Sequence, residues 1–485
     1  MNSIVVWAWW ISLWKNGVVP SVAIGGAGPN KDCSPSRAYS TERALLRGGL
    51  RVQGAEAKGY SCDTGSATRP VALTWLCWFA LICRVEKSEN VLEPLPYHFE
   101  LKDYLKSEES ELWNWFASAR AKADYTENLR LELLKSTYRL DAEGHPELYK
   151  TVEEAKSRLQ LDIPVTLYQA QNSPQINAAL FFMPGEGHVV FSGSLLTLLN
   201  AEELKSVIGH ELAHYHLWGR DNGEFHITDR LILAVANDPR AAASHEQTAR
   251  RYQLYTEIFA DRGSLCVTGD VNTVIGGLVK IQTGLSQVSA PGYLKQAEEI
   301  FAKGNVATEG LSHPEPFIRA RALALWQEQR NDAATHISEM IEGATALDEL
   351  DVIGQKRLSS ATRRLLEFLL RPKWFQTPAV LGHAKLFFED FRPVNGNGSA
   401  IPHGLKFPDA KLREYLCYVL LDFAKADPDL DEMPLAAALE LSRQLELDAP
   451  FEKLAARELK MKVRDVRKLK EQAAELLAKA EVSSE

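Results

Sequence analysis

The sequence predicts a mostly helical α+β fold, with a small β-sheet near the middle of the chain and an all-α C-terminal region. From about residue 95, leucines and aromatic residues recur at helical spacing among Lys and Glu. Between residues 162 and 192, three short apolar runs bounded by Gly, Pro and Asn interrupt this pattern and indicate strands. From about residue 332 the composition is helical again.

Composition and charge limit the classes of function. The 485 residues, 45% hydrophobic and 25% charged, suit two or three globular domains. The net charge of -9 lacks the excess of Lys and Arg that phosphate binding needs, so we expect no nucleic-acid partner. Four of the six cysteines lie within the first 83 residues, and the rest of the chain is typical of a reduced, cytoplasmic protein.

Residues 1–92 are predicted to be an N-terminal extension without a recognisable domain pattern. Its two apolar runs, residues 4–14 and 71–83, are shorter than the roughly 20 residues that span a bilayer as a helix. Three interpretations stay open: a peripheral membrane anchor, an artefact of a start codon upstream of the natural one, and a signal peptide, although no Lys or Arg precedes the first run. We expect membrane association only through this extension.

Residues 93–330 form the next predicted domain, which begins with scaffold helices that carry Leu112, Trp113 and Phe116 at helical spacing. Its predicted strands occupy residues 164–168, 179–183 and 188–191. Two interpretations of the resulting sheet stay open. Either an edge strand holds an extended peptide by main-chain hydrogen bonds, or the strands form an ordinary hairpin.

The helix expected after this sheet carries the sequence VIGHELAHY, which contains an HExxH motif. Asn200, with Glu203 three residues later, is a capping-box pattern that predicts a helix start at the residue after Asn200. On this helix His210 and His214 lie one turn apart on the same face, where two imidazoles can bind one zinc ion. Glu211 takes the position of a general base beside them.

A hydrolytic zinc site needs a third protein ligand, and the sequence EIFAD contains the best candidate. Glu257 and Asp261 lie one turn apart on a long predicted helix that begins near His245. Glu257 can bind the metal, while Asp261 can accept a hydrogen bond from a ligating histidine and fix its tautomer. In isolation the two residues would form surface salt bridges, but the upstream HExxH motif favours the ligand interpretation.

Residues 167–321 resemble the zinc metallopeptidases that include HtpX-like and CAAX-prenyl-endopeptidase-like proteins, which are gluzincins with HExxH and ExxAD motifs. The resemblance rests on five ordered pieces: Asn177-Ala178, SGSLL at 192–196, HELAH at 210–214, EIFAD at 257–261, and His313-Pro314 with Arg319. Such an ordered series is far more specific than HExxH alone.

The resemblance implies a zincin-type metallopeptidase domain that holds one Zn²⁺ per chain. The zinc ligands that it implies are His210, His214 and Glu257. Glu211 would be the catalytic base, and His313 with Arg319 would stabilise the oxyanion of the tetrahedral intermediate. We interpret the remaining histidines near the motif as structural or surface residues: His188, His216 and His226.

One departure from these relatives concerns the membrane. Many of them carry transmembrane hairpins beside the HExxH helix, whereas residues 217–245 contain only one short apolar run, at 231–236. We therefore expect the catalytic domain to lie outside the membrane. For the same reason, the prenylated or membrane-protein substrates of these relatives are not carried over to this chain.

The remaining chain is divided into a helical segment with a linker, residues 331–407, and a helical C-terminal module, residues 408–485, which weakly resembles TerB-like modules. The acidic residues at 426–432 lack the glycine and ligand spacing of an EF-hand, which favours a solvated turn over a cation site. The basic run at 460–470 is interpreted as a solvated helix face.

Together these patterns predict a zinc-dependent metalloendopeptidase that hydrolyses peptide bonds through a metal-activated water. The expected partner is a peptide or an unfolded protein, and the expected setting is protein quality control or processing. The alternative is a catalytically quiet zinc-fold scaffold or partner-binding module, with the C-terminal helices as its working surface.

Overall fold

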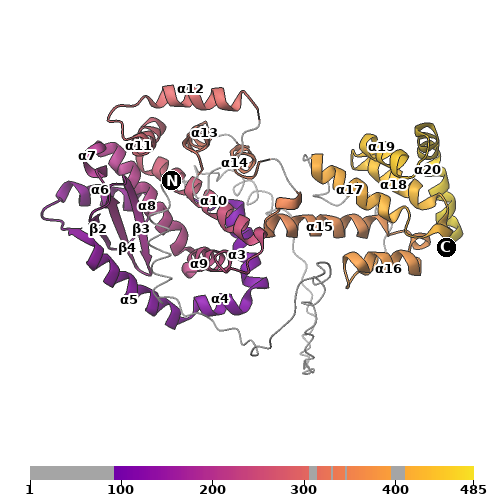
Figure 1. Cartoon of the computed structure of the whole chain (residues 1–485), viewed down its shortest axis with the longest axis horizontal. Helices are drawn as coiled ribbons and strands as arrows, with labels where there is room; N and C mark the ends of the chain where they lie inside the picture. Colours follow the sequence, from indigo (N-terminus) through magenta and orange to yellow (C-terminus); the bar gives the residue numbers. More distant parts are fainter. Residues whose placement is uncertain (1–91, 305–313, 329–330, 344–346, 395–409, 485) are drawn as a thin grey trace, which may run out of the picture. The chain divides into compact units, whose positions relative to one another are not determined.

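The computed structural model describes residues 92–304, 314–328, 331–343, 347–394 and 410–484. The predicted fold class is confirmed, because helices make up most of the described chain and accompany one four-stranded sheet (Figure 1). The described residues from 347 onward contain no strand. None of the described helices is long and apolar enough to cross a membrane. The apolar runs at 4–14 and 71–83 lie outside the described residues.

Within the described residues, the sheet is preceded by α3 (Pro96–Glu108), α4 (Ser110–Ala117) and α5 (Ala119–Ser136). Proline at the first position suits the start of α3, because the missing N–H has no partner there in any helix. Trp113 and Phe116 of α4 are buried in the same hydrophobic cluster as Leu101 and Leu105 of α3. These helices therefore form the scaffold that the helical spacing predicts.

The sheet has the strand order β1-β2-β4-β3. Its strands are β1 (Thr137–Leu140), β2 (Val165–Ala170), β3 (Asn177–Met183) and β4 (Glu186–Ser192). Strands β2 and β4 are parallel, and the other two pairs are antiparallel. Helix α6 (Pro146–Arg158) connects β1 to β2. Strand β1 was not predicted, because it follows α5 directly and buries only Leu140, so no apolar alternation marks it.

Successive side chains of β4 point to opposite faces of the sheet, so they pack into two different hydrophobic clusters. Val189 and Phe191 pack with residues of α6 and of α8 (Ala201–Gly219). Val190 packs instead with Leu129 and Leu133 of α5. Helix α5 therefore covers one face of the sheet, and α6 with α8 covers the other. Strand β3 lies at the edge, and within the described residues it pairs only with β4.

Helix α8 follows a short turn, α7 (Leu195–Leu198), and begins where the capping box predicts. Asn200 Oδ1 accepts the Glu203 N–H at 3.0 Å, and the Glu203 carboxylate accepts the Asn200 N–H at 3.0 Å. Glu203 also forms a buried ion pair with Lys280 of α11 (Val271–Thr283), at 2.8 Å between Nζ and Oε1. The start of α8 is thus fixed both locally and against α11.

After α8 the chain reverses through η1 (Arg220–Gly223), where Asp221, Asn222 and Gly223 all have positive φ. Helix α9 (Glu224–Ala236) and the 26-residue α10 (Ala243–Thr268) follow. Helix α10 packs along α8 and α9. Three more helices complete this part of the chain: α12 (Ala290–Phe301), α13 (Pro316–Gln327) and α14 (Ala333–Glu342).

One hydrophobic cluster, with buried residues from Ala361 to Ala473, forms the core of the C-terminal helices. These helices are α15 (Val352–Leu369), α16 (Pro378–Phe387), α17 (Ala410–Phe423), α18 (Met433–Gln444), α19 (Asp448–Glu458) and α20 (Val463–Ser484). Described residues on both sides of the predicted boundary at 407/408 contribute to this cluster, and the predicted domain division stays a prediction. The TerB-like resemblance stays a prediction.

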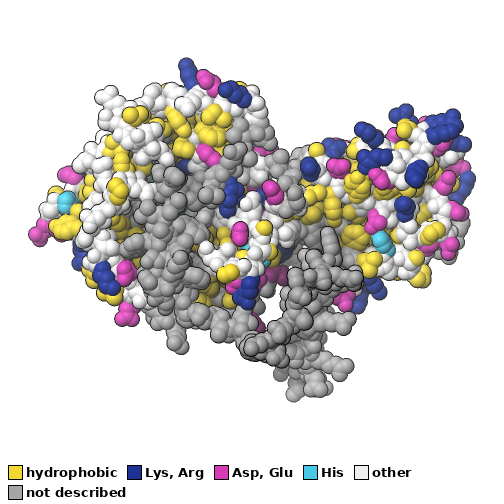
Figure 2. All heavy atoms as spheres, viewed as in Figure 1, with side chains coloured by type: hydrophobic (Ala, Val, Ile, Leu, Met, Phe, Trp, Pro, Cys, Tyr) yellow, Lys and Arg dark blue, Asp and Glu magenta, His cyan; other side chains and the backbone are white. Residues whose placement is uncertain are grey.

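Charged side chains lie on the surface of these C-terminal helices (Figure 2). In the basic run, the side chains of Arg464 and Arg467 are 76% and 67% exposed, as expected of a solvated face. In the acidic turn, Asp427 accepts hydrogen bonds from Thr377 Oγ1 at 2.6 Å and from the Asp429 N–H at 3.0 Å. Asp427 therefore stabilises the turn itself.

A buried histidine, His98, joins α3 to α10. The Leu95 N–H donates to its Nδ1 at 3.1 Å, and its Nε2 lies 3.3 Å from Thr256 Oγ1. Because Nδ1 accepts a hydrogen bond, the ring carries its proton on Nε2 and is neutral. Burial lowers the pKa of His98 from its ordinary value of 6.5 to about 3.

We predict that His98 makes the folded chain less stable as pH falls below about 6.5. In that range the unfolded chain takes up a proton that the folded chain does not, so the free energy of unfolding falls by about 1.4 kcal/mol per pH unit until pH approaches 3. Urea unfolding of the wild type and of His98→Gln between pH 7 and pH 5 measures this slope. The variant, which keeps a donor and an acceptor but does not titrate, should show the shallower slope. Equal slopes would contradict the prediction.

Candidate active site

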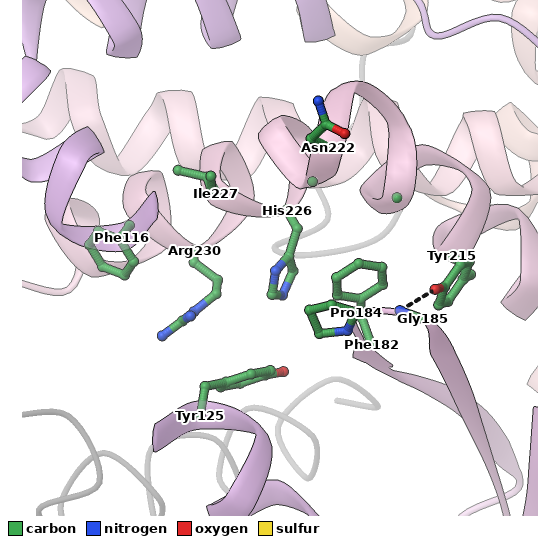
Figure 3. Close-up of a pocket in the computed structure, with 12 residues that line it drawn as sticks. Phe116, Tyr125, Phe182, Pro184, Gly185, Tyr215, Asn222, His226, Ile227 and Arg230 are labelled. Carbon is green, nitrogen blue, oxygen red and sulfur yellow. Dashed lines mark hydrogen bonds between the residues drawn. The ribbon is translucent and has the colours of Figure 1, made fainter. Parts of the chain in front are cut away.

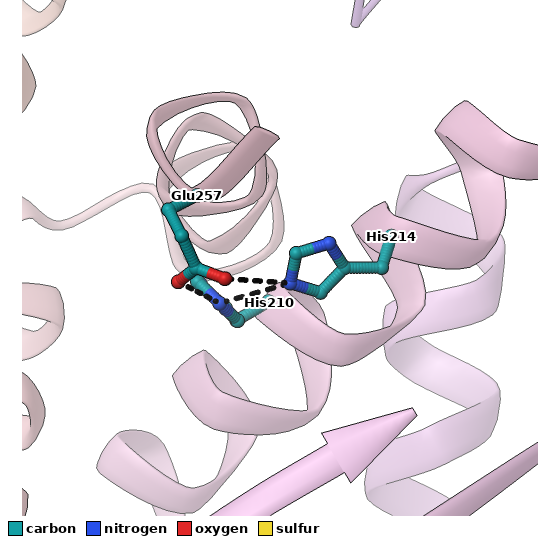
Figure 4. A group of neighbouring side chains, drawn as sticks. All are labelled: His210, His214 and Glu257. Atoms are coloured by element: carbon teal, nitrogen blue, oxygen red, sulfur yellow. Dashed lines mark hydrogen bonds and ion pairs between the residues drawn. The ribbon is translucent and has the colours of Figure 1, made fainter. Parts of the chain in front are cut away.

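Two helices bring three metal-ligating side chains together. His210 and His214 project from α8, and Glu257 projects from α10 toward them (Figure 4). The Nε2 atoms of the two histidines lie 3.3 Å apart. Oε2 of Glu257 lies 3.4 Å from Nε2 of His210, and Oε1 of Glu257 lies 3.6 Å from Nε2 of His214. The structure therefore gathers the three predicted ligands at one point.

The three side chains lie close enough together to hold one zinc ion, because one ligand atom from each lies within 4.8 Å of the others. Tetrahedral zinc bonds nitrogen and oxygen at about 2.0–2.2 Å, which places its ligand atoms about 3.3–3.6 Å from one another. Nδ1 of His210 lies 3.1 Å from Asp261 Oδ1, so the ring proton belongs on Nδ1 and Nε2 turns its lone pair toward the centre. His210, His214 and Glu257 would hold the zinc ion as three protein ligands, the number found in catalytic zinc sites that also bind water.

The carboxylates of this centre attract positive charge. Burial by itself disfavours a charged His210 ring, but the hydrogen bonds to Asp261 and Glu257 outweigh burial and raise the pKa of His210 to about 10. A proton and a metal ion compete for such a position, because metal binding requires the neutral imidazole. The same negative field that favours the imidazolium therefore also favours a bound dication.

Behind the ligands, Asp261 is held by Arg319 of α13. The guanidinium donates from Nε to Oδ2 at 2.7 Å and from Nη2 to Oδ1 at 2.5 Å, and both residues are buried. Burial raises the pKa of Asp261, but Arg319 and His210 outweigh it and hold the pKa below its usual value. Asp261 is therefore ionised and aligned on His210. Nη1 of Arg319 also lies 3.8 Å from Glu257 Oε2.

Comparison with known proteins agrees with this geometry. Residues 143–327 match the family model described as peptidase family M48. This region is similar to M48 peptidases. The match supports a metallopeptidase, and metallopeptidases of this family generally use zinc, which suits the His-His-Glu group. Searches of curated proteins and of solved structures found no match to the chain. The finer resemblance to HtpX-like and CAAX-prenyl-endopeptidase-like proteins stays a prediction.

The structure describes two of the three remaining predicted site residues of this M48-like region, Glu211 and Arg319. Glu211 is buried beside His210 on α8, near enough to Arg319 for its charge to raise the arginine pKa. His313 lies outside the described residues. Arg319 was predicted to act with His313 on the oxyanion, and that role stays a prediction. Its pairing with Asp261 was not predicted, because the two residues are 58 positions apart and no local pattern links them.

The three histidines that were interpreted as structural or surface residues lie apart from the ligand group. His188 is buried in the sheet, with Nδ1 at 3.2 Å from the Tyr168 hydroxyl. His216 stacks on Phe259, with ring centroids 6.4 Å apart. His226 lines a cavity between α8 and α9.

Small residues allow α8 and α10 to approach closely. A Cβ atom on Gly263 of α10 would lie only 2.3 Å from Cβ of Ala213, the residue before His214. A Cβ atom on Gly209 would lie 3.0 Å from Cβ of Val267. Ser264 Oγ also donates to the Ser206 carbonyl across the same contact, at 2.8 Å. This contact sets the distance between the ligands of α8 and Glu257.

We predict that Gly263→Ala destabilises the fold and weakens zinc binding. The added methyl group overlaps Ala213, so the helices must separate, at a cost of about 1–3 kcal/mol in the free energy of unfolding. Separation also moves Glu257 away from the histidines. Thermal unfolding and zinc titration against a competing chelator measure the two effects.

Two further variants test the cause of this loss. Adding Ala213→Gly to Gly263→Ala removes the overlapping methyl group and should recover zinc affinity. The helix-propensity costs of the two changes nearly cancel, because one helical glycine replaces another. Gly382→Ala on α16, where the new Cβ meets open space, is the matched control and should leave both measurements unchanged or slightly improve stability. Wild-type zinc affinity in Gly263→Ala would show that the contact does not set the ligand spacing.

Proposed function

We propose that this chain is a zinc-dependent metalloendopeptidase. The observation that carries the proposal is the convergence of two imidazole nitrogens and a carboxylate. Nε2 of His210 and Nε2 of His214 lie 3.3 Å apart, and the two oxygens of Glu257 lie 3.4 Å from the first and 3.6 Å from the second. Glu211, a carboxylate on the same helix, directly follows the first of these ligands. The match to peptidase family M48 over residues 143–327 supports the same reaction class.

Each protein group has a defined task in this proposal. When bound, zinc polarises the scissile carbonyl and makes water a competent nucleophile near neutral pH. Glu211 takes a proton from the attacking water and later passes it to the leaving amine, so that one water molecule is added across the peptide bond. Asp261, fixed by Arg319, holds the His210 ring in its ligating tautomer. His313 and Arg319 are proposed to steady the oxyanion.

The edge strand of the sheet suggests how a substrate is held. Strand β3 pairs with β4 on one side only within the described residues, and it packs against α8. The other side of β3 can therefore add an extended peptide through main-chain hydrogen bonds beside the metal ligands. Only an unfolded or locally extended chain can pair in this way. This requirement favours peptides and unfolded proteins as substrates, and a role in quality control or processing.

We predict that Glu211→Gln keeps zinc and loses peptide cleavage. The amide cannot take a proton from water, so cleavage of an unfolded protein should fall by about 10²–10⁴-fold. Because Glu211 is not one of the three ligands, zinc content should stay at one per chain. Zinc analysis of the purified full chain and a cleavage assay with an unfolded protein measure these two quantities.

The matched control is Glu202→Gln, which removes an exposed carboxylate from the first turn of the same helix. It should leave both zinc content and cleavage unchanged. Full activity of Glu211→Gln would refute the assigned base. Stoichiometric zinc without cleavage of any tested peptide by the wild type would favour a catalytically quiet scaffold instead.

A further inference from the structure

A cavity of about 280 Å³ lies beside the C-terminal end of the HExxH helix. Its walls come from α4, α5, the β3–β4 turn, the end of α8, η1 and the start of α9 (Figure 3). Gly219 of its lining follows His214 by five residues, which is about 7.5 Å along a helix axis. This size suits one amino-acid residue better than a larger ligand. The cavity is therefore within reach of a peptide that is bound at the metal ligands.

Aromatic rings connect the cavity wall to a metal ligand. Trp218 stacks on the His214 ring, with centroids 5.3 Å apart, and lies 6.0 Å from the ring of His226, which lines the cavity. Phe182, at the end of β3, lies 4.5 Å from His226. The proposed edge strand for the substrate therefore leads to this cavity.

The turn between β3 and β4 is tied down at the edge of the cavity. The Gly185 N–H donates to the Tyr215 hydroxyl at 3.1 Å, and Tyr215 belongs to α8 (Figure 3). Gly185 has φ of +86°, a conformation that favours glycine. The cavity is thus shaped in advance by contacts between the sheet and the HExxH helix.

A buried arginine lies within these aromatic walls. Arg230 of α9 is 7% exposed, and its guanidinium lies 4.4 Å from the centre of the Tyr125 ring and 5.2 Å from that of Phe116. Figure 3 shows the side chain extending from α9 toward Tyr125. Its Nε atom is buried, and the part of the chain that the structure describes offers it no hydrogen-bond partner. Contacts with ring faces compensate only part of the lost hydration of a cation.

The carboxyl group of the neighbouring Asp229 does not form an ion pair with Arg230. Within the described residues, no ion pair joins Arg230 to Asp229 or to any other carboxylate. Burial raises the pKa of Asp229 to about 7, so near neutral pH this side chain carries only part of a negative charge. The planar guanidinium keeps donors for a second, external carboxylate, which it can bind through two parallel hydrogen bonds.

We propose that this cavity binds a carboxylate of the peptide substrate through Arg230, with the apolar part of the same residue against the aromatic rings. The inference rests on the proposed peptidase function. An extended peptide advances about 3.3 Å per residue, so the recognised residue lies two or three positions from the scissile bond. The carboxylate belongs either to an acidic side chain or to the free C-terminus, and the two sources share the same chemistry.

Matched peptides test the proposal on the zinc-loaded full chain. One set differs only by Glu or Gln at each position within three residues of the scissile bond, and another ends in a free acid or an amide. The wild type should cleave one carboxylate form about tenfold faster or more, as kcat/KM, than its neutral partner. The pair that shows the preference identifies the source of the carboxylate.

Variants then connect the preference to the arginine. Arg230→Gln should bring the carboxylate-to-neutral ratio to about one. Arg230→Lys keeps the charge over the rings but loses the paired donors, so it should give an intermediate ratio. Arg240→Gln, which removes an exposed arginine that pairs with Asp238, should keep the wild-type ratio. Because the ratio is taken within one preparation, partial misfolding of a variant does not alter it.

Binding separates this inference from the peptidase proposal. The same peptides, fluorescently labelled, are titrated against Glu211→Gln with and without Arg230→Gln, and anisotropy gives the affinity without any cleavage. Carboxylate-dependent binding that is lost with Arg230→Gln supports the pocket even if the wild type cleaves nothing, in which case only the peptidase proposal fails. No carboxylate preference in the wild type, or an unchanged preference in Arg230→Gln, would overturn the inference.

Discussion

The close contact between α8 and α10 is the constraint on which the rest of the site depends. The three candidate metal ligands come from two helices, so their spacing is only as fixed as the distance between the two helix axes. Gly263 against Ala213 brings the backbones together, and the hydrogen bond from Ser264 to the Ser206 carbonyl fixes their register. Ligand geometry must hold to a fraction of an ångström for catalysis, and rigid helices hold it better than loops.

Charged side chains from three helices meet at the centre of this contact. Asp261 and Glu257 of α10 face His210 of α8, and Arg319 of α13 supplies a fixed positive charge behind them. Buried carboxylates are costly without cations, and one arginine leaves room for more positive charge. A metal dication meets this need. Arg319 of α13 therefore fixes Asp261, and Asp261 in turn determines which ring nitrogen of His210 carries the proton.

Local signals predicted much of this structure. The capping box at Asn200 located the start of α8, and three apolar runs located β2, β3 and β4. Helical spacing alone placed His210 with His214, and Glu257 with Asp261, on shared faces. A resemblance to known metallopeptidases added the expectation that these two faces meet. Each of these features depends on residues within a few positions of one another.

The features that sequence analysis missed depend on contacts across the fold. Strand β1 exists because it pairs with β2, not because its own residues alternate. Helix α15 contributes to two hydrophobic clusters. Its residues from Ala361 onward are buried in the C-terminal cluster, whereas Val352 and Ile353 in its first turn are buried in the cluster that contains α3 and α4. The pairing of Arg319 with Asp261 and the enclosure of Arg230 by Tyr125 and Phe116 join residues far apart in the chain. Short sequence patterns cannot predict contacts between residues that lie far apart in the chain.

X-ray absorption spectroscopy of the zinc-loaded full chain measures whether these three side chains bind the metal. A site built by His210, His214 and Glu257 predicts one zinc per chain with two imidazole nitrogens and oxygen ligands at about 2.0–2.2 Å. A first shell that contains sulfur at about 2.3 Å, or one without imidazole, would contradict the account.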